Sequence, residues 1–545
     1  MILIIDFGSQ FNQLIARRVR ENEVYCQIEP AGLSLDKIRL FNPDGIILSG
    51  GPSSIYEENS PTIDAGIFKL GVPVLGICYG MHFMIQALGG KIARPKKREY
   101  GFATLEIKDH KTSVGTESEQ KLSNKKSSLS LFKGMHSPFQ CWMSHGDSTE
   151  ILPDNFVITA STENTAIAAI ADVQNRFFGL QFHPEVEHTI NGTAMISNFL
   201  FDVCNCKKSW NMESFANGAI AQIKETVGDK KVIMGLSGGV DSSVAALLIH
   251  KAIGKNLHCI FVDNGLLRKN EKENLEKSFT AHLTKQVITD GSVNPNSNSN
   301  PDMNIIFVDA QKKFLDALKD VSDPERKRKE IGRIFIQVFE AEASKIEGAD
   351  FLGQGTLYPD IIESKSAFGG PTSIIKSHHN VGGLPEKMNL KLIEPLQLLF
   401  KDEVRKLGIE LGLNEDMVWR QPFPGPGLAI RIMGTVSEKR LTILREADSI
   451  LLEEIRYAGL YRELWQSFAV LLPVKSVGVM GDKRTYDSCI AIRAVNSKDA
   501  MTADWARLPH ELLAKISNRI INEVDGVNRV VFDITSKPPG TIEWE

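Results

Sequence analysis

Short, uninterrupted apolar runs alternate with stretches of helical periodicity along most of this chain. In the first third, such runs cover residues 2–5, 45–48, 72–77 and 178–182. Continuous apolar runs of this length are typical of parallel strands that are covered on both faces. The pattern therefore predicts an α/β fold, and 545 residues are enough for roughly three or four domains.

A further apolar run, residues 231–234, leads through a glycine-rich turn into a helix over residues 244–249. Such a turn offers backbone N–H groups and the positive end of a helix dipole to an anion. Ser237, Ser242 and Ser243 add hydroxyl donors, but no lysine follows the glycines as it does in the common phosphate loop. The turn is therefore predicted to bind phosphate in another way.

The segment 421–427 contains three prolines and two glycines, which cannot continue a helix or a central strand. Beyond it, apolar runs and helical periodicity predict a small α/β domain with helices over 437–457 and 508–524 and strands over 467–472 and 527–534. The predicted domains are 1–205, 206–420 and 421–545.

Composition and charge exclude several classes of protein. The net charge of −4 gives no reason to expect nucleic acid or an anionic membrane as a partner. No apolar run approaches the ~18 residues of a membrane span, and the first residues lack the basic segment of a signal peptide. Seven cysteines in a chain of this length favour reduced thiols and a cytosolic location.

The run Gly76-Ile77-Cys78-Tyr79-Gly80 lies where a predicted strand meets a predicted helix. This is the pattern of a nucleophile elbow, with cysteine in place of serine. A sulfur at a helix N-terminus is favoured as thiolate. A buried structural cysteine is the simpler alternative, but the flanking glycines favour catalysis.

A cysteine nucleophile needs a base and a group that orients the base. His183 ends an apolar run, and Glu185 follows it by two residues. The sequence thus predicts a Cys78–His183–Glu185 triad. The backbone N–H groups of Gly51 and Tyr79 are the predicted oxyanion hole.

These motifs, together with 6–10, 49–52 and 144–147, resemble the triad (class I) glutamine amidotransferases. The resemblance implies that Cys78 attacks the side-chain amide of glutamine and releases ammonia. It also implies a set of glutamine-binding residues: His82, Ser144, His145 and Gly146. The family usually has glutamine where this chain has His82.

The run 237–243 resembles the loop of the N-type ATP pyrophosphatases, whose domain is a doubly wound sheet of the adenine-nucleotide α-hydrolase type. That resemblance assigns ATP to Ser237, Gly238, Gly239, Val240, Asp241, Ser242 and Ser243, with Val262 on the neighbouring strand. Carboxylates suit Mg²⁺, and the candidates are Asp241, Asp360 and Glu363. A glycine-flanked segment with Lys376, His378 and His379 is predicted to be a lid.

Taken as a whole, the chain resembles the glutamine-hydrolysing GMP synthetase family. The resemblance implies xanthosine 5′-monophosphate (XMP) as acceptor, ATP with Mg²⁺ as the energy source, and no tightly bound organic cofactor. It also implies a homodimer formed through the C-terminal domain. By position, the XMP contacts are Arg326, Gln466, Lys537 and Glu543.

Other interpretations fit the sequence less well. Asparagine synthetase has its cysteine at the mature N-terminus, and CTP synthetase places its amidotransferase last. A tRNA-thiolating enzyme needs cysteine pairs in its pyrophosphatase domain, where this chain has Cys259 alone. An inactive scaffold has no need of an intact triad and an intact loop.

Overall fold

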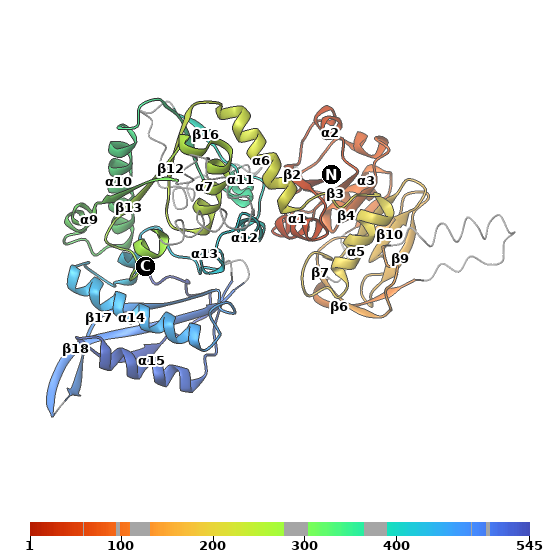
Figure 1. Ribbon diagram of the computed structural model, residues 1–545. Helices are drawn as coiled ribbons and strands as arrows, with labels where there is room; N and C mark the ends of the chain where they lie inside the picture. The colour runs from red at the N-terminus through yellow and green to blue at the C-terminus, as the bar shows by residue number, and fades with distance from the viewer. Residues whose placement is uncertain are drawn as a thin grey trace, which may run out of the picture. The chain divides into compact units, whose positions relative to one another are not determined.

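The computed structural model describes residues 1–57, 59–93, 99–108, 131–276, 303–364, 390–480, 482–497 and 502–545. The chain forms two compact units, Met1–Phe215 with Pro359–Pro371, and Ala216–Tyr358 with Thr372–Glu545 (Figure 1). Among the described helices, none is both long enough and apolar enough to cross a bilayer.

The first unit is built on a nine-stranded sheet in the order β2-β1-β3-β4-β11-β10-β9-β6-β7. Its strands are β1 (Ile2–Asp6), β2 (Cys26–Pro30), β3 (Gly45–Leu48), β4 (Val74–Ile77), β6 (Glu99–Ile107), β7 (Phe139–His145), β9 (Val157–Ser161), β10 (Ala169–Asp172) and β11 (Phe177–Leu180). A separate pair is formed by β5 (Lys91–Ala93) and β8 (Ser148–Ile151).

The five strands from β2 to β11 are parallel, and four of them, β1, β3, β4 and β11, are the strands that the uninterrupted apolar runs predicted. Strand β2 was not predicted, because Gln27 and Glu29 interrupt its apolar residues. The other four strands of the sheet, β10, β9, β6 and β7, are antiparallel and were not predicted either. Along β6, exposed and less exposed residues alternate, as in a sheet with one solvated face. Such alternation is a weaker signal than a continuous apolar run.

Helix α3 (Tyr79–Ala87) packs on β4 and β11, and α1 (Asn12–Glu21) packs on β1, β2 and α5 (Gly192–Asn198). A short helix α2 (Leu35–Phe41) precedes β3. The core beneath these helices is fully apolar, with Ile5, Leu48 and Met81 completely buried. It fixes the carboxyl ends of β3, β4 and β11 side by side.

The second unit contains a five-stranded parallel sheet in the order β14-β13-β12-β15-β16. Its strands are β12 (Lys231–Gly235), β13 (Leu257–Asp263), β14 (Asn304–Asp309), β15 (Ala349–Gly353) and β16 (Lys391–Ile393). Its helices are α6 (Met212–Val227), which begins at the end of the first unit, α7 (Val240–Ile253), α9 (Gln311–Ala317), α10 (Pro324–Ala343), α12 (Lys401–Glu410) and α13 (Glu415–Val418). Helix α11 (Tyr358–Ser364) belongs, apart from Tyr358, to the first unit. Strand order reverses between β12 and β15, which is where open α/β sheets bind ligands.

A long antiparallel ribbon follows, formed by β17 (Gln466–Met480) and β18 (Lys483–Asn496) (Figure 1). The short strand β19 (Asp504–Trp505) and the parallel strand β20 (Val527–Phe532) also pair with β18. Helices α14 (Glu438–Tyr457) and α15 (His510–Glu523) pack on this sheet. The strand predicted over 467–472 is much longer in the structure. The prediction stopped short because the second half of the strand is largely exposed and contains no apolar run.

One apolar core runs through both sheets of the second unit. Ile260 and Phe314 on the parallel side belong to the same cluster as Leu444, Ile490 and Ile516 beyond residue 421. The boundary predicted at 420–421 therefore lies within continuous packing.

The last residues of the chain are bound to the rest of this unit. Lys327, which is completely buried, donates to the carbonyl oxygens of Ala429 (3.1 Å) and Ile432 (2.7 Å) and to the Glu545 carboxylate. Trp544 Nε1 donates to Asp533 Oδ2 at 2.9 Å. The ammonium ion thereby joins α10, the segment after residue 427 and the tail.

Replacing Lys327 with Met should lower the free energy of unfolding of this unit by about 3–5 kcal/mol, because it leaves a buried carboxylate without a counter-ion. Urea unfolding followed by fluorescence measures the change. The exposed Lys329→Met on the same helix is the matched control. Equal stability of the two variants would contradict this account of the tail.

Candidate active sites

Cys78 lies on the sharp turn between β4 and α3, with φ of 50° and ψ of −107°. This left-handed backbone is rare for a side chain larger than hydrogen. A Cβ on Gly76 would come within 2.7 Å of Gly80 O, and one on Gly80 within 2.3 Å of Leu48 O. Glycines flank the cysteine because the turn leaves no room for side chains.

The predicted base and its orienting carboxylate lie beside Cys78. His183 Nδ1 and Glu185 Oε1 are 2.7 Å apart, and both side chains are almost completely buried. Arg18 Nε donates to Glu185 O at 3.1 Å, and Phe11 packs edge-on against the imidazole. These contacts fix the ring with its other nitrogen toward the thiol.

The electrostatics of the pair favour charge separation. Burial by itself lowers the pKa of His183, but the Glu185 charge and hydrogen bonds with Cys78 and Glu185 outweigh it and raise the pKa to about 10. At neutral pH the imidazole is therefore protonated, and its positive charge stabilises a Cys78 thiolate.

The predicted oxyanion donors border the same turn. A Cβ on Gly51 would lie 2.7 Å from Phe7 O, and one on Gly50 would lie 3.1 Å from His183 Cε1 and 3.7 Å from Cys78 Cβ. The loop after β3 thus packs directly against the nucleophile. The Tyr79 N–H is at the first position of α3, where a helix offers it no acceptor.

The end of β7 forms another side of this site. The Cys78 thiol contacts Ser144 O at 3.5 Å. His145 donates from Nδ1 to Asp147 O at 2.8 Å, and burial lowers its pKa. A Cβ on Gly146 would lie 3.5 Å from Tyr100 Oη. Of these predicted glutamine-binding residues, Ser144 contacts Cys78 directly, and the turn after it lies next to the nucleophile.

The His82 side chain is buried and is not open to a ligand. Its ring is 3% exposed, and Nε2 lies 2.6 Å from Gln181 Oε1. Gln181, which is completely buried, directs Nε2 to Cys78 Sγ at 3.9 Å. Gln181 was not predicted as a site residue, although a polar residue within an apolar run was a usable signal.

The phosphate loop lies between β12 and the N-terminus of the fourteen-residue helix α7. Gly238 has φ of +75°, and Ser243 Oγ donates to Gly239 O at 2.9 Å. Ser237 and Ser242 hold each other through their hydroxyls at 3.0 Å. The loop therefore keeps a fixed shape at the positive end of the helix dipole.

Two cations at this loop were not predicted. Lys401 Nζ lies 2.6 Å from Asp241 Oδ2, and Arg420 donates to Gly238 O at 2.8 Å and to the Glu271 carboxylate. Lys401 begins α12, where the helix dipole disfavours a positive charge. That mismatch is the signal that sequence reasoning could have used.

The residues predicted for a metal are only partly described. Asp241 Oδ1 is buried without a hydrogen-bond partner, so it can accept a cation. A Cβ on Gly355, after β15, would lie 3.2 Å from the Asp241 carbonyl carbon. Asp360 lies on α11, and the Glu363 side chain is outside the described residues. Within the described ranges, no three His, Cys, Asp or Glu residues form a ready metal site.

Other predicted nucleotide contacts have mixed outcomes. Val262 is buried in β13, next to β12. Lys376, His378 and His379, the predicted lid, lie outside the described residues.

Of the four predicted XMP contacts, two touch each other. Gln466 Nε2 donates to Glu543 Oε1 at 2.8 Å, and the buried Arg431 donates to the same carboxylate at 2.8 and 3.1 Å. The Lys537 backbone pairs with Ala503, and Arg326 is exposed in the first turn of α10.

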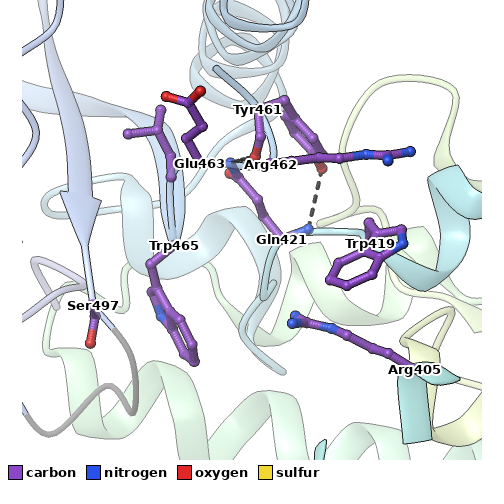
Figure 2. A pocket seen from close by; sticks show the side chains of 9 residues that line it. Arg405, Trp419, Gln421, Tyr461, Arg462, Glu463, Trp465 and Ser497 are labelled. Atoms are coloured by element: carbon purple, nitrogen blue, oxygen red, sulfur yellow. Dashed lines mark hydrogen bonds between the residues drawn. The ribbon is translucent and has the colours of Figure 1, made fainter. Parts of the chain in front are cut away.

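A cavity of about 120 Å³ lies beside Gln421 in the same unit. Figure 2 shows Arg405, Trp419 and Trp465 around it, with the Gln421 N–H donating to Tyr461 Oη at 3.2 Å. Gln421 Oε1 accepts from Ser467 N, the residue next to Gln466. The cavity therefore borders the start of β17.

Three family models match separate parts of the chain. Family models match at residues 3–203 (glutamine amidotransferase class-I), 214–290 (NAD synthase) and 453–544 (GMP synthase C terminal domain). A solved glutamine amidotransferase from Thermotoga maritima is 18% identical, covers 42% of this chain and 85% of its own, and has a TM-score of 0.26.

Full-length relatives are much closer. The glutamine-hydrolysing GMP synthase of Brachyspira hyodysenteriae is 56% identical, and that of Heliobacterium modesticaldum is 55% identical. Each alignment covers 100% of this chain and 99% of the relative. The chain therefore belongs to the family of glutamine-hydrolysing GMP synthases.

Proposed function

We propose that Cys78, His183 and Glu185 hydrolyse glutamine, and that the loop 237–243 binds the ATP with which XMP is adenylylated and then aminated to GMP. The observation that carries the first part is the position of Cys78 Sγ, on a strained turn in hydrogen-bond contact with His183. The products are glutamate, GMP, AMP and pyrophosphate.

In the glutaminase reaction, the Cys78 thiolate attacks the side-chain carbonyl carbon of glutamine. The oxyanion that forms lies toward the N–H groups of Gly51 and Tyr79. The His183 imidazolium gives its proton to the departing ammonia. His183 then takes a proton from water, whose oxygen attacks the thioester carbon, and the Cys78 sulfur leaves as thiolate, which restores the starting ion pair. Glu185 holds the ring in the required orientation throughout.

Glutamine is proposed to lie along the turn after β7, near Ser144, His145 and Gly146. This turn is held to the catalytic residues by the contact between Cys78 and Ser144. His82 borders the same site through Gln181.

In the synthetase reaction, the loop N–H groups and the hydroxyls of Ser237, Ser242 and Ser243 hold the phosphates of ATP. Lys401 and Arg420 add positive charge next to the loop. The XMP carbonyl oxygen attacks the α-phosphorus and releases pyrophosphate, and ammonia then displaces AMP from the purine carbon. Lys376, His378 and His379 remain proposed lid residues for this step, and Val262 a proposed ATP contact.

The donor set at Asp241 fits Mg²⁺. Oδ1 is buried and unpartnered, and a carboxylate oxygen is a ligand that this ion prefers. Asp241 would hold the ion, with Asp360 and Glu363 as further proposed ligands. When bound, Mg²⁺ neutralises phosphate charge.

The acceptor site is proposed to lie at the docked tail. Gln466 and Glu543 are joined by a hydrogen bond, and Arg431 beneath them fixes the carboxylate. A carboxylate so held can accept from purine N–H groups, while Lys537 and Arg326 supply charge for the phosphate.

Incubation with ATP, Mg²⁺, glutamine and XMP, with products identified by mass, tests the whole reaction. GMP, AMP, pyrophosphate and glutamate are expected together. Omission of XMP should abolish AMP formation. AMP formed without any change in XMP would contradict the proposal.

Lys537→Met should raise the Michaelis constant for XMP by about tenfold or more, because one charge-assisted phosphate contact is lost. Steady-state kinetics with ammonium salts measures this. Deleting the tail is a poorer test, since it would also remove the partners of Lys327 and Arg431. Lys439→Met, exposed on α14, is the matched control. Unchanged XMP kinetics would remove Lys537 from the site.

We also propose a homodimer formed through the ribbon of β17 and β18. The ribbon exposes several apolar side chains, which is typical of an interaction surface: Val474 (53%), Val477 (47%), Val479 (71%) and Tyr486 (67%). Sedimentation of Val477→Lys should give a monomer where the parent chain gives a dimer.

The seven free thiols fit a reducing compartment, so the cytosol is the proposed location.

A further inference from the structure

His82 occupies a position from which it reaches the nucleophile through one other side chain. Its Nε2 lies 2.6 Å from Gln181 Oε1, and Gln181 Nε2 lies 3.9 Å from Cys78 Sγ. Exposure is 3% for His82 and 0% for Gln181. These contacts link His82 on α3 to the sulfur of Cys78.

The direction of each hydrogen bond follows from the charge state of His82. Burial lowers the pKa of His82 to about 4, so the ring is neutral at neutral pH and carries one N–H. A carbonyl oxygen only accepts, and therefore the proton must be on Nε2. The other titratable groups that face this ring are His145 on β7 and Asp147 after it. The pKa of His145 is also lowered by burial, so His145 adds no charge at neutral pH.

The hydrogen bond from His82 leaves the Gln181 carboxamide one orientation. With Oε1 occupied, the NH₂ group is directed to the sulfur. The Gln181 backbone is also fixed, since its N–H donates to Ala168 O at 2.9 Å. A thiolate accepts a hydrogen bond from an amide N–H more strongly than a thiol does, because the thiolate carries a negative charge.

We propose that His82 and Gln181 are positioning residues of the glutaminase reaction: His82 fixes the Gln181 carboxamide, and Gln181 donates to the Cys78 thiolate. The positive charge of His183 and the Gln181 dipole then act on the same sulfur from one segment, the residues that directly follow β11. This inference rests on the proposed role of Cys78.

The thiolate fraction of Cys78 is measured directly by its rate of alkylation with iodoacetamide as a function of pH, without glutamine, ATP or XMP. In Gln181→Met, which lacks the donor, the rate at neutral pH should fall roughly tenfold and the midpoint of the profile should move to higher pH. Gln181→Glu places a second negative charge beside the sulfur, so its midpoint should move further in the same direction.

The variants of His82 separate positioning from packing. His82→Phe keeps a ring but no donor, and its profile should move toward that of Gln181→Met. His82→Gln restores a donor for Oε1 and should return the midpoint to that of the parent chain. Gln86→Met, at an exposed position of the same helix, is the control for the substitution itself.

Glutaminase kinetics complete the test. The proposal expects kcat to fall in Gln181→Met and His82→Phe while the Michaelis constant for glutamine changes little. A midpoint that stays at the parent value in both variants overturns the proposal, whatever happens to the overall rate. Should His82→Phe not fold, the comparison of His82→Gln with Gln181→Glu decides in the same way. A parent chain that alkylates at Cys78 but releases no glutamate would instead contradict the proposed function.

Discussion

Cys78→Ala should abolish the use of glutamine and leave GMP synthesis from ammonium salts intact. The Cys78 thiol is the nucleophile in contact with His183 and forms the proposed acyl intermediate, so the glutaminase rate should fall by about 10⁴-fold or more. The ATP loop belongs to the other compact unit and does not need the thiol. Glutamate release and ammonium-dependent GMP formation are measured on the same preparation.

Cys206→Ala is the matched control, because Cys206 is a half-buried free cysteine of the same unit that lies outside the proposed triad. It should retain both activities. Loss of ammonium-dependent synthesis in Cys78→Ala would show that the elbow serves the second reaction as well, and would contradict the division of chemistry between the units.

Asp241→Asn should stop adenylyl transfer with either nitrogen source. The change removes the negative charge that faces Lys401 and is proposed to bind Mg²⁺, and it replaces one of the two carboxylate oxygens by an NH₂ group. Losing one such electrostatic contact to the transferring group costs roughly 10²–10³-fold in rate. Pyrophosphate release in the presence of XMP and ammonium is the measurement, and alkylation of Cys78 should be unaffected.

Asp229→Asn, exposed just before β12, controls for removing one negative charge from this unit. Its pyrophosphate release should equal that of the parent chain. Wild-type release by Asp241→Asn would remove Asp241 from the synthetase reaction. If pyrophosphate release survives only at raised Mg²⁺, the metal role is supported.

The parallel strands that were predicted from sequence are runs of mostly apolar residues, as in Ile2–Asp6 and Lys231–Gly235. The far half of β17 was not predicted, because Lys475, Ser476 and Gly478 interrupt its apolar residues and leave no continuous run. The antiparallel strands of the first sheet were missed for the same reason. Strands β6 and β7 are defined by their pairing with each other, and neither contains a continuous apolar run.

Within the site, the Cys78 turn and the His183–Glu185 pair could be predicted because each is marked by a local pattern: Cys78 has glycines two residues away on both sides, and Glu185 is two residues from His183. Gln181 and Lys401 were missed because no such local pattern marks them, and their partners are 103 and 160 residues away. Such contacts depend on which strands and helices become neighbours, and a single sequence does not specify that.

The apolar core that joins the parallel sheet to the ribbon of β17 and β18 limits how this enzyme can be recombined with others. A split gene or a chimaera cut at residue 421 would separate Ile260 and Phe314 from Leu444 and Ile516, and each half would expose a large apolar face to water. Such fragments should aggregate when expressed alone. Exchange between relatives should succeed only when residues 216–545 are transferred as one piece, so the nucleotide-activating and acceptor-binding parts are expected to be inherited together.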